Sequence, residues 1–202
     1  MKRSEKPTYT KQRKPIIVLI CEGRNKTERL YFNHFNYRSA PYNLKIEDSE
    51  STDIESMVKK ALSIWKEYQL NSEYGDHLYC LIDLDLNKDK YAKYVKIHES
   101  KKYRNIEIIL SNPCFECWLM YYFTDNPKGV SSSQKAKTEM SNYITDYDES
   151  TDVIKVCKLE DSHSLAIDRS IKKNLLYDKI GTSLIDKNPY SEVQQILRIL
   201  NK

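Results

Sequence analysis

The sequence lacks any long apolar run, and it is poor in the features that mark membrane or secreted proteins. No stretch of its 202 residues approaches the roughly 18–20 consecutive apolar residues that cross a bilayer. The N-terminus is basic, but the apolar segment of a secretion signal does not follow it. The five cysteines are odd in number and scattered, which favours reduced thiols. We therefore expect a cytoplasmic protein that does not contact a membrane.

Two common patterns of metal-binding or catalytic residues are also missing. Cys114 and Cys117 form one C-x-x-C pair, but a second pair is absent, so a zinc or redox site is not favoured. The four histidines show no ligand-like spacing, and none stands out as a catalytic base. We find no internal repeat and no low-complexity linker. If the chain carries a chemical site, other residue types must form it.

The net charge of +4 is unevenly distributed along the chain. Residues 1–14 hold six Lys or Arg and one Glu, a balance of +5, so the remainder carries −1. The main body is therefore not a basic nucleic-acid platform by net charge. We expect residues 1–14 to be a basic flexible tail, either simply solvated or able to contact phosphate groups. Residues 15–202 are expected to form a single domain.

Strand and helix patterns alternate through the first 123 residues. We expect strands at Ile16–Cys21, Asn43–Ser49, His77–Asp85 and Asn105–Pro113, with helices at Thr27–Asn36, Thr52–Tyr68, Lys90–Glu99 and Phe115–Phe123. Further helices are expected near Ser133–Ile144, Asp161–Asp178 and Pro189–Leu200, the last capped by Asn188, with a last strand at Asp152–Cys157. This order predicts an α/β fold with a mostly parallel sheet covered by helices and a helical C-terminal part.

Carboxylates follow two of the predicted buried strands. Glu22 comes directly after the first strand, and Asp83 and Asp85 end the third. Ligands of open α/β sheets bind outside the carboxyl ends of the strands, and residues two apart in a strand point to the same side. Neighbouring carboxylates repel each other unless a cation compensates, which Mg²⁺ or Mn²⁺ does through oxygen ligands. The alternatives for the D-x-D pattern are a helix cap, a solvated loop or a surface acid pair. For Glu22 the alternative is a first-turn acid stabilised by the helix dipole.

Five further residues are weaker candidates near the same edge of the sheet. Lys26 can bind a phosphate at a helix N-terminus or can simply face solvent. Glu28 and Glu116 are candidate auxiliary metal ligands, although Glu28 is also suited to stabilise the start of its helix. Ser111 and Asn112 end the fourth strand, where they can bind substrate, orient a carboxylate or form an Asn-Pro turn before the next helix.

The acidic pattern, a glutamate after the first strand and D-x-D after the third, resembles the Toprim domain of topoisomerases, primases and some nucleases. The segments "CEGRNKTERLYF", "SNPCFECWLMYYF" and "NPYSEVQQIL" resemble the RloB-like family, Toprim-related proteins of bacterial restriction-linked and abortive-infection loci. This resemblance extends from Pro15 over most of the chain. One departure is that only Asp89 continues the acidic pattern after Asp85, which places a second metal site in doubt.

The resemblance implies a Toprim-like, Rossmann-like domain with a metal-dependent nuclease site used in antiviral defence. Glu22, Asp83 and Asp85 would be its catalytic residues and would bind Mg²⁺ or Mn²⁺. The implied partners are nucleic acid, either DNA or RNA, and an ATPase of the AAA or ABC type.

Other functional classes remain to be weighed against a nuclease. The main alternative is a non-catalytic nucleic-acid-binding or regulatory subunit on the same fold. A haloacid-dehalogenase phosphatase also uses D-x-D, but on its first strand and with Thr or Val after it. Here the motif is on the third strand, and Leu86 follows it. A topoisomerase or complete primase is excluded, because the chain is too short for a tyrosine-bearing gate and lacks a zinc-binding domain.

Overall fold

The structure is a computed structural model, and it describes residues 13–22 and 26–201. Most of the expected basic tail, residues 1–12, lies outside the described residues, as does Gly23 of the segment after the first strand. The last two residues of the tail contact the domain. The guanidinium of Arg13 forms an ion pair with Asp76 at 2.6 Å, and the ammonium of Lys14 donates to the carbonyl oxygen of Ala40.

The described residues form a five-stranded sheet, which confirms the predicted α/β fold. Its strands are β1 (Ile16–Cys21), β2 (Asn43–Asp48), β3 (His77–Asp83), β4 (Glu107–Asn112) and β5 (Tyr190–Ser191). Their order in space is β2-β1-β3-β4-β5, with the first four parallel and β5 antiparallel to β4. The carboxyl ends of the central pair, β1 and β3, therefore lie side by side.

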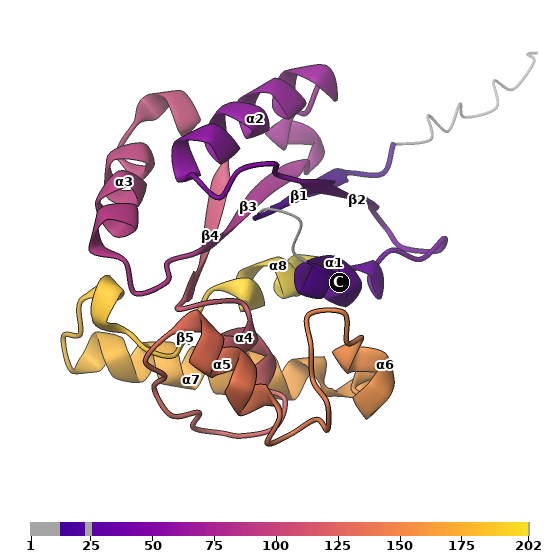
Figure 1. The fold of residues 1–202 in the computed structure, drawn as a ribbon. Coiled ribbons are helices and arrows are strands. Elements are labelled where there is room, and N and C mark those ends of the chain that lie inside the picture. Colours follow the sequence, from indigo (N-terminus) through magenta and orange to yellow (C-terminus); the bar gives the residue numbers. More distant parts are fainter. Residues whose placement is uncertain (1–12, 23–25, 202) are drawn as a thin grey trace, which may run out of the picture.

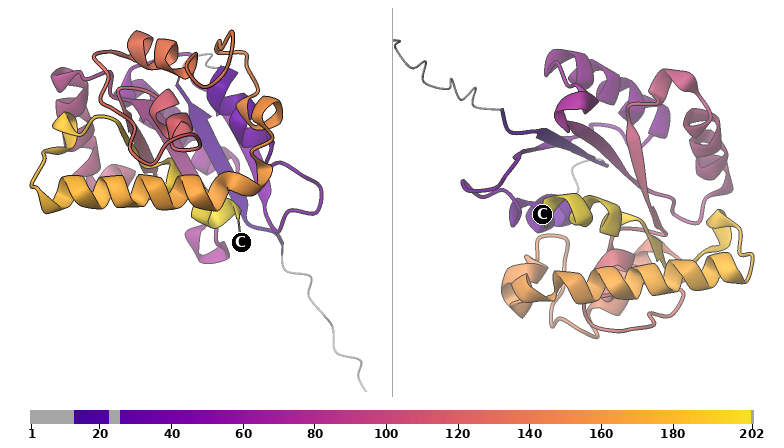
Figure 2. Two further views of the ribbon diagram at one scale, coloured as in Figure 1. Left: turned by 90° about the horizontal axis from the view of Figure 1, so that it is seen from below. Right: turned by 180° about the vertical axis from the view of Figure 1, so that it is seen from behind.

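Helices cover both faces of this sheet (Figure 1). The helices are α1 (Lys26–Asn33), α2 (Ile54–Glu67), α3 (Lys88–His98), α4 (Glu116–Met120), α5 (Ser133–Met140), α6 (Val153–Cys157), α7 (His163–Lys179) and α8 (Val193–Leu200). Short 3₁₀ turns occupy Ser72–Tyr74, Lys101–Tyr103, Glu160–Ser162 and Leu184–Asp186. One apolar core packs the sheet against α2 and α3, and the other packs it against α1, α4 and α8. The long helix α7 runs along the outer side of the helices α4 and α8 (Figure 2).

Side chains alternate between these two faces along each central strand. In β1, Ile20 packs in the core beneath α2 and α3, whereas in β3, Leu81 packs in the core beneath α1 and α4. Glu22 continues the row of Ile20, and Asp83 continues the row of Leu81. The two acids at the adjacent strand ends are therefore directed toward opposite faces of the sheet.

Two elements of the C-terminal part differ from the prediction. The segment expected to be a strand, Asp152–Cys157, is helix α6, because the Asp152 carboxylate accepts a hydrogen bond from the Lys155 amide and caps a helical turn. The helix expected from Pro189 begins only at Val193, after β5. Asn188 does not cap it, because the Asn188 side chain is bonded to the backbone of Val130 instead.

Within the described residues, every helix is too short or too polar to cross a bilayer. The five cysteines all lie in this part of the chain and are free thiols, four of them buried. Cys114 and Cys117 are among the buried ones and pack in the core around Trp118. They therefore behave as small apolar residues.

Candidate acidic site at the carboxyl edge of the sheet

Glu22 follows β1 and is held by groups from two other elements. One carboxylate oxygen accepts a hydrogen bond from the Asp83 amide at 3.0 Å, and the other pairs with the Lys90 ammonium at 2.7 Å. Its side chain is 10% exposed. Burial raises the pKa of Glu22, and although Lys90 and the Asp83 amide oppose this shift, the net change is upward. The ionised form of Glu22 is therefore less favourable here than that of an exposed glutamate.

The strand prediction was wrong at Asp85, because β3 ends at Asp83. Asp85 and Leu86 adopt left-handed conformations, with φ of 54° and 56°. This turn is fixed by backbone hydrogen bonds from the Leu84 amide to the Ser111 carbonyl and from the Asp85 amide to the Pro113 carbonyl. Asp83 and Asp85 therefore do not share one side of a strand. The Asp85 side chain is 46% exposed at the end of the turn.

Asp83 lies among several other carboxylates. Its pKa is raised well above the usual range, first by burial of the carboxyl group and then by repulsion from Glu28, Glu22, Glu116 and Asp85. Both Glu28, on α1, and Glu116, on α4, are only 1% exposed. The two weak auxiliary candidates thus belong to the electrostatic environment of Asp83. This concentration of acids disfavours a full set of negative charges unless a cation is present.

Lys90 is a component of the site that the search for acids did not identify. Its ammonium lies between two carboxylates, 2.7 Å from Glu22 and 3.1 Å from Asp85. Burial would lower the pKa of Lys90, but the two carboxylates raise it further, so the ammonium stays charged. The sequence feature that could have identified Lys90 is its position in the first turn of the helix that follows the D-x-D pattern.

An open cleft of about 420 Å³ lies over these groups. The cleft is lined by Glu22, Thr52, Asp53, Ile54, Asp85, Asn87, Asp89, Lys90 and Lys93. Asp89, the residue that continues the acidic pattern, therefore belongs to the same cleft. The cleft gives solvent and a polar ligand access to Glu22, Asp85 and Lys90.

Ser111 and Asn112 lie in the interior rather than facing a substrate. Ser111 is 4% exposed, and Asn112 is fully buried. The side-chain oxygen of Asn112 accepts a hydrogen bond from the Leu86 amide at 3.1 Å, and its nitrogen donates to the carbonyls of Ile185 and Lys187 at 2.9 Å each. Asn112 therefore fixes the turn that carries Asp85. It does not cap α4, whose first turn has no side-chain cap.

Lys26 occupies the first position of α1 and is exposed. It lines a different cavity from the one over Glu22, together with residues of α5 and the loop before α6. Its predicted contact with a phosphate remains a prediction.

The side chains at this edge fit a hard divalent cation in donor type. Five acids lie close together at this edge and supply carboxylate oxygens, the ligands that Mg²⁺ and Mn²⁺ prefer. These five acids are Glu22, Glu28, Asp83, Asp85 and Glu116. One oxygen of buried Glu116 accepts from the Tyr147 hydroxyl at 3.2 Å, and the other has no hydrogen-bond partner within residues 13–22 and 26–201. Across the same residues, no three His, Cys, Asp or Glu side chains are arranged as a ready-made metal site. Cation binding therefore requires side-chain movement, with displacement of the Lys90 ammonium as the simplest route.

Comparison with known proteins identifies one family. A family model described as RloB-like protein matches residues 17–200, from the second residue of β1 to the last residue of α8. Neither the curated proteins nor the solved structures contain a significant match to the chain. The match covers most of the chain and includes all five acids of the edge. The chain therefore belongs to the RloB-like protein family.

Proposed function

We propose that this chain is a metal-dependent nuclease that hydrolyses phosphodiester bonds on a Toprim-like domain. The observation that carries the proposal is that Glu22, just after β1, Asp83, at the end of β3, and Asp85, in the turn after β3, lie near one another at one carboxyl edge of a parallel sheet. This is the edge at which open α/β sheets bind their ligands. The position of Glu22 one strand away from Asp83 also agrees with the Toprim pattern.

In this proposal the acids have distinct roles. Asp83 and Asp85 would hold Mg²⁺ or Mn²⁺, and the metal would supply positive charge against the charge that develops on the phosphodiester oxygens. Glu22 either completes the ligand set or accepts a proton from the attacking water. The second role is supported by its raised pKa, since a general base is most effective when its pKa approaches the working pH.

Lys90 has two roles in this scheme. Before the cation binds, its ammonium neutralises Glu22 and Asp85. With a cation held by these carboxylates, Lys90 would no longer be needed to neutralise them, and its ammonium, on α3, could contact a phosphate oxygen of the substrate. The open cleft over Glu22 and Asp85 leaves space for such a contact.

Membership of the RloB-like family supports a role in bacterial antiviral defence. We further propose that an ATPase of the AAA or ABC type controls the activity. A controlled nuclease can be silent in isolation, so cation binding is a better first test than cleavage.

The decisive measurement is calorimetric titration of Mn²⁺ and Mg²⁺ into the wild type and into the double variant Asp83→Asn/Asp85→Asn. We expect binding to the wild type and its loss in the double variant. The matched control is Asp161→Asn/Asp168→Asn, which removes two exposed acids near and on α7. Equal titrations of the wild type and the Asp83/Asp85 variant, with nucleic acid present, would contradict the proposal.

One observation favours the second candidate, a non-catalytic binding or regulatory subunit. Lys90 already neutralises two of the acids, as an internal ion pair would in a protein that needs no metal. If the wild type binds nucleic acid but no divalent cation, this second function replaces the first.

A further inference from the structure

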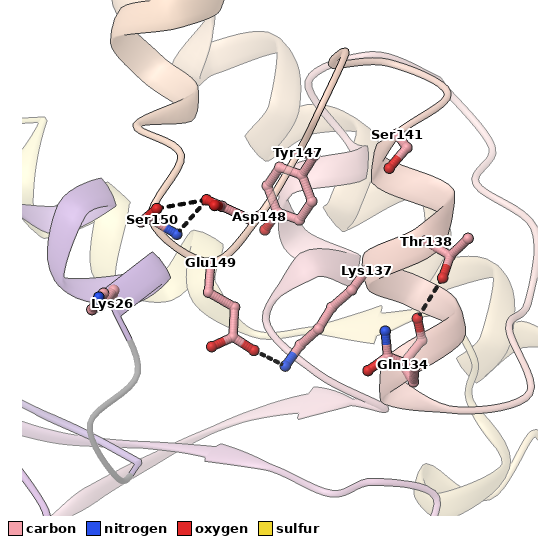
Figure 3. A pocket seen from close by; sticks show the side chains of 9 residues that line it. All are labelled: Lys26, Gln134, Lys137, Thr138, Ser141, Tyr147, Asp148, Glu149 and Ser150. Atoms are coloured by element: carbon pink, nitrogen blue, oxygen red, sulfur yellow. Dashed lines mark hydrogen bonds and ion pairs between the residues drawn. The ribbon is translucent and has the colours of Figure 1, made fainter.

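A second cavity lies beside the acidic edge, on the α1 and α4 side of the sheet. It has a volume of about 540 Å³, within the range of small-molecule and nucleotide sites. Nine residues line it: Lys26, Gln134, Lys137, Thr138, Ser141, Tyr147, Asp148, Glu149 and Ser150. They come from the start of α1, from α5 and from the loop before α6 (Figure 3). No step of the proposed hydrolysis uses these residues.

Glu116 connects this cavity to the acidic edge. The hydroxyl of Tyr147, in the cavity wall, donates to one oxygen of Glu116 at 3.2 Å. Glu116 in turn contributes to the raised pKa of Asp83. A molecule bound in the cavity would therefore contact Tyr147, the residue that holds the Glu116 carboxylate.

Helix α5 provides a second connection between the two regions. Its first residue, Ser133, donates to the Asp85 carboxylate at 2.5 Å. Lys137 follows one turn later on the same helix face, roughly 6 Å further along the axis, and lines the cavity. One face of α5 thus extends from the acidic edge into the cavity.

The charges of the cavity argue against a site for an isolated phosphate. Lys26 and Lys137 are balanced by Asp148 and Glu149, and the ammonium of Lys137 pairs directly with Glu149 (Figure 3). The Asp148 carboxylate accepts hydrogen bonds from the amide and hydroxyl of Ser150 at 2.8 and 2.7 Å, so it shapes its own loop. The cavity carries no net charge to attract an anion.

The same lining suits a nucleobase. The Gln134 amide, the hydroxyl of Ser141 and the Lys137–Glu149 pair offer both donors and acceptors, as base edges require. The Tyr147 ring adds an aromatic surface, and aromatic side chains are the usual platforms for unpaired bases. We propose that this cavity binds one unpaired nucleobase of a single-stranded nucleic acid. If the nuclease proposal holds, the phosphodiester beside that base lies at the acidic edge.

This assignment specifies the substrate class. A base can present both its edge and its face to this lining only when it is unpaired or has been pulled out of the duplex, which costs a few kcal/mol. The cavity therefore favours a single strand or a loop over a continuous duplex. Base binding in the cavity does not depend on the metal, whereas cleavage at the acidic edge does.

The test is fluorescence anisotropy in EDTA, with a short fluorescein-labelled single strand, as RNA and as DNA, and with the matching duplex. The variants are Lys137→Met and Gln134→Leu, both of α5 side chains in the cavity wall. The matched control is Lys135→Met, an exposed lysine of the same helix that pairs with Glu139 and lines a different cavity. Circular dichroism checks that each variant is folded.

We expect the wild type to prefer the single strand to the duplex. Each cavity variant should weaken single-strand binding by about 10-fold, as loss of base contacts does in other proteins, with the control unchanged. Comparing the RNA and DNA strands then distinguishes the two sources of the base. Equal affinity for single strand and duplex, an equal loss in the Lys135→Met control, or absence of binding would overturn the proposal. Because EDTA removes the metal, failure of the nuclease proposal does not change this result.

Discussion

The ammonium of Lys90 lies 2.7 Å from a carboxylate oxygen of Glu22, and both side chains are largely buried. Neither charge is stable alone in such an environment, because burial penalises an uncompensated ion. In the metal-free protein Lys90 therefore supplies the positive charge that the acidic edge needs. A divalent cation at this edge would have to compete with the Lys90 ammonium for the same oxygens.

Replacing Lys90 with Met tests this competition. We expect Lys90→Met to bind Mn²⁺ more tightly than the wild type, because no ammonium has to be displaced. In EDTA the same variant should lose about 1–3 kcal/mol of its free energy of unfolding, since Glu22 is left without its charged partner. Calorimetry and urea denaturation measure the two effects, with Lys96→Met, an exposed lysine of the same helix, as the control. Weaker Mn²⁺ binding by Lys90→Met would show that the ammonium assists the metal site.

Asp83 gives a prediction for the pH dependence of stability. Its folded-state pKa is raised, so folding favours its protonated form. The associated stability is fully present below the unfolded pKa of about 4 and is lost as the pH rises through the folded pKa. Asp83→Asn mimics the protonated form, so in EDTA it should be more stable than the wild type at pH 8 and similar near pH 4. Urea midpoints across this range provide the measurement. Asp168→Asn, at an exposed position, should show no such trend.

Cation binding should release protons. The pKa values of Glu22 and Asp83 are both raised, and a divalent cation binds their deprotonated forms. The affinity for Mn²⁺ should therefore increase with pH until both acids are ionised in the metal-free protein. Calorimetry in two buffers with different ionisation enthalpies counts the released protons. A binding enthalpy that is identical in the two buffers would mean that these acids are already ionised or do not bind the metal.

Asn112 supports the site from a distance, through the turn at Asp85. Asn112→Ala leaves the partly buried Leu86 amide and two carbonyls without their partner, which should reduce the free energy of unfolding by about 2–4 kcal/mol. It should also weaken Mn²⁺ binding, because the position of Asp85 is no longer fixed. The control is Asn142→Ala, at an exposed asparagine just after α5. If Asn112→Ala is destabilised but folded and binds Mn²⁺ as tightly as the wild type, Mn²⁺ binding does not depend on the turn at Asp85.

The parallel sheet could be predicted because its strands are continuous buried runs between amphipathic helices. The expected strand Ile16–Cys21 agrees with β1 at both ends. The C-terminal part was harder to predict, because its polar and apolar residues follow neither the helical nor the strand period clearly. At Asp152 a side-chain cap determined a helix where β-branched residues favoured a strand. Two residues of β5 are too few to give a pattern of their own.

Sequence order was enough to place Glu22 and Asp83 at one edge, but not to define the geometry of the site. The left-handed turn at Asp85 depends on carbonyl groups of Ser111 and Pro113, which belong to another strand and the loop after it. Lys90 enters the site from a helix whose orientation no local pattern specifies. Both features arise from tertiary contacts.

The residues that line the second cavity are close together in the sequence, whereas the acids are not. The five acids lie in or just after β1, α1, β3 and α4, within the first 116 residues. By contrast, eight of the nine cavity residues lie between Gln134 and Ser150. Changes confined to that short stretch leave β1, β3 and β4 intact. If the two proposals hold, replacing this one continuous segment would change the preferred target and leave the elements that carry the acids unchanged.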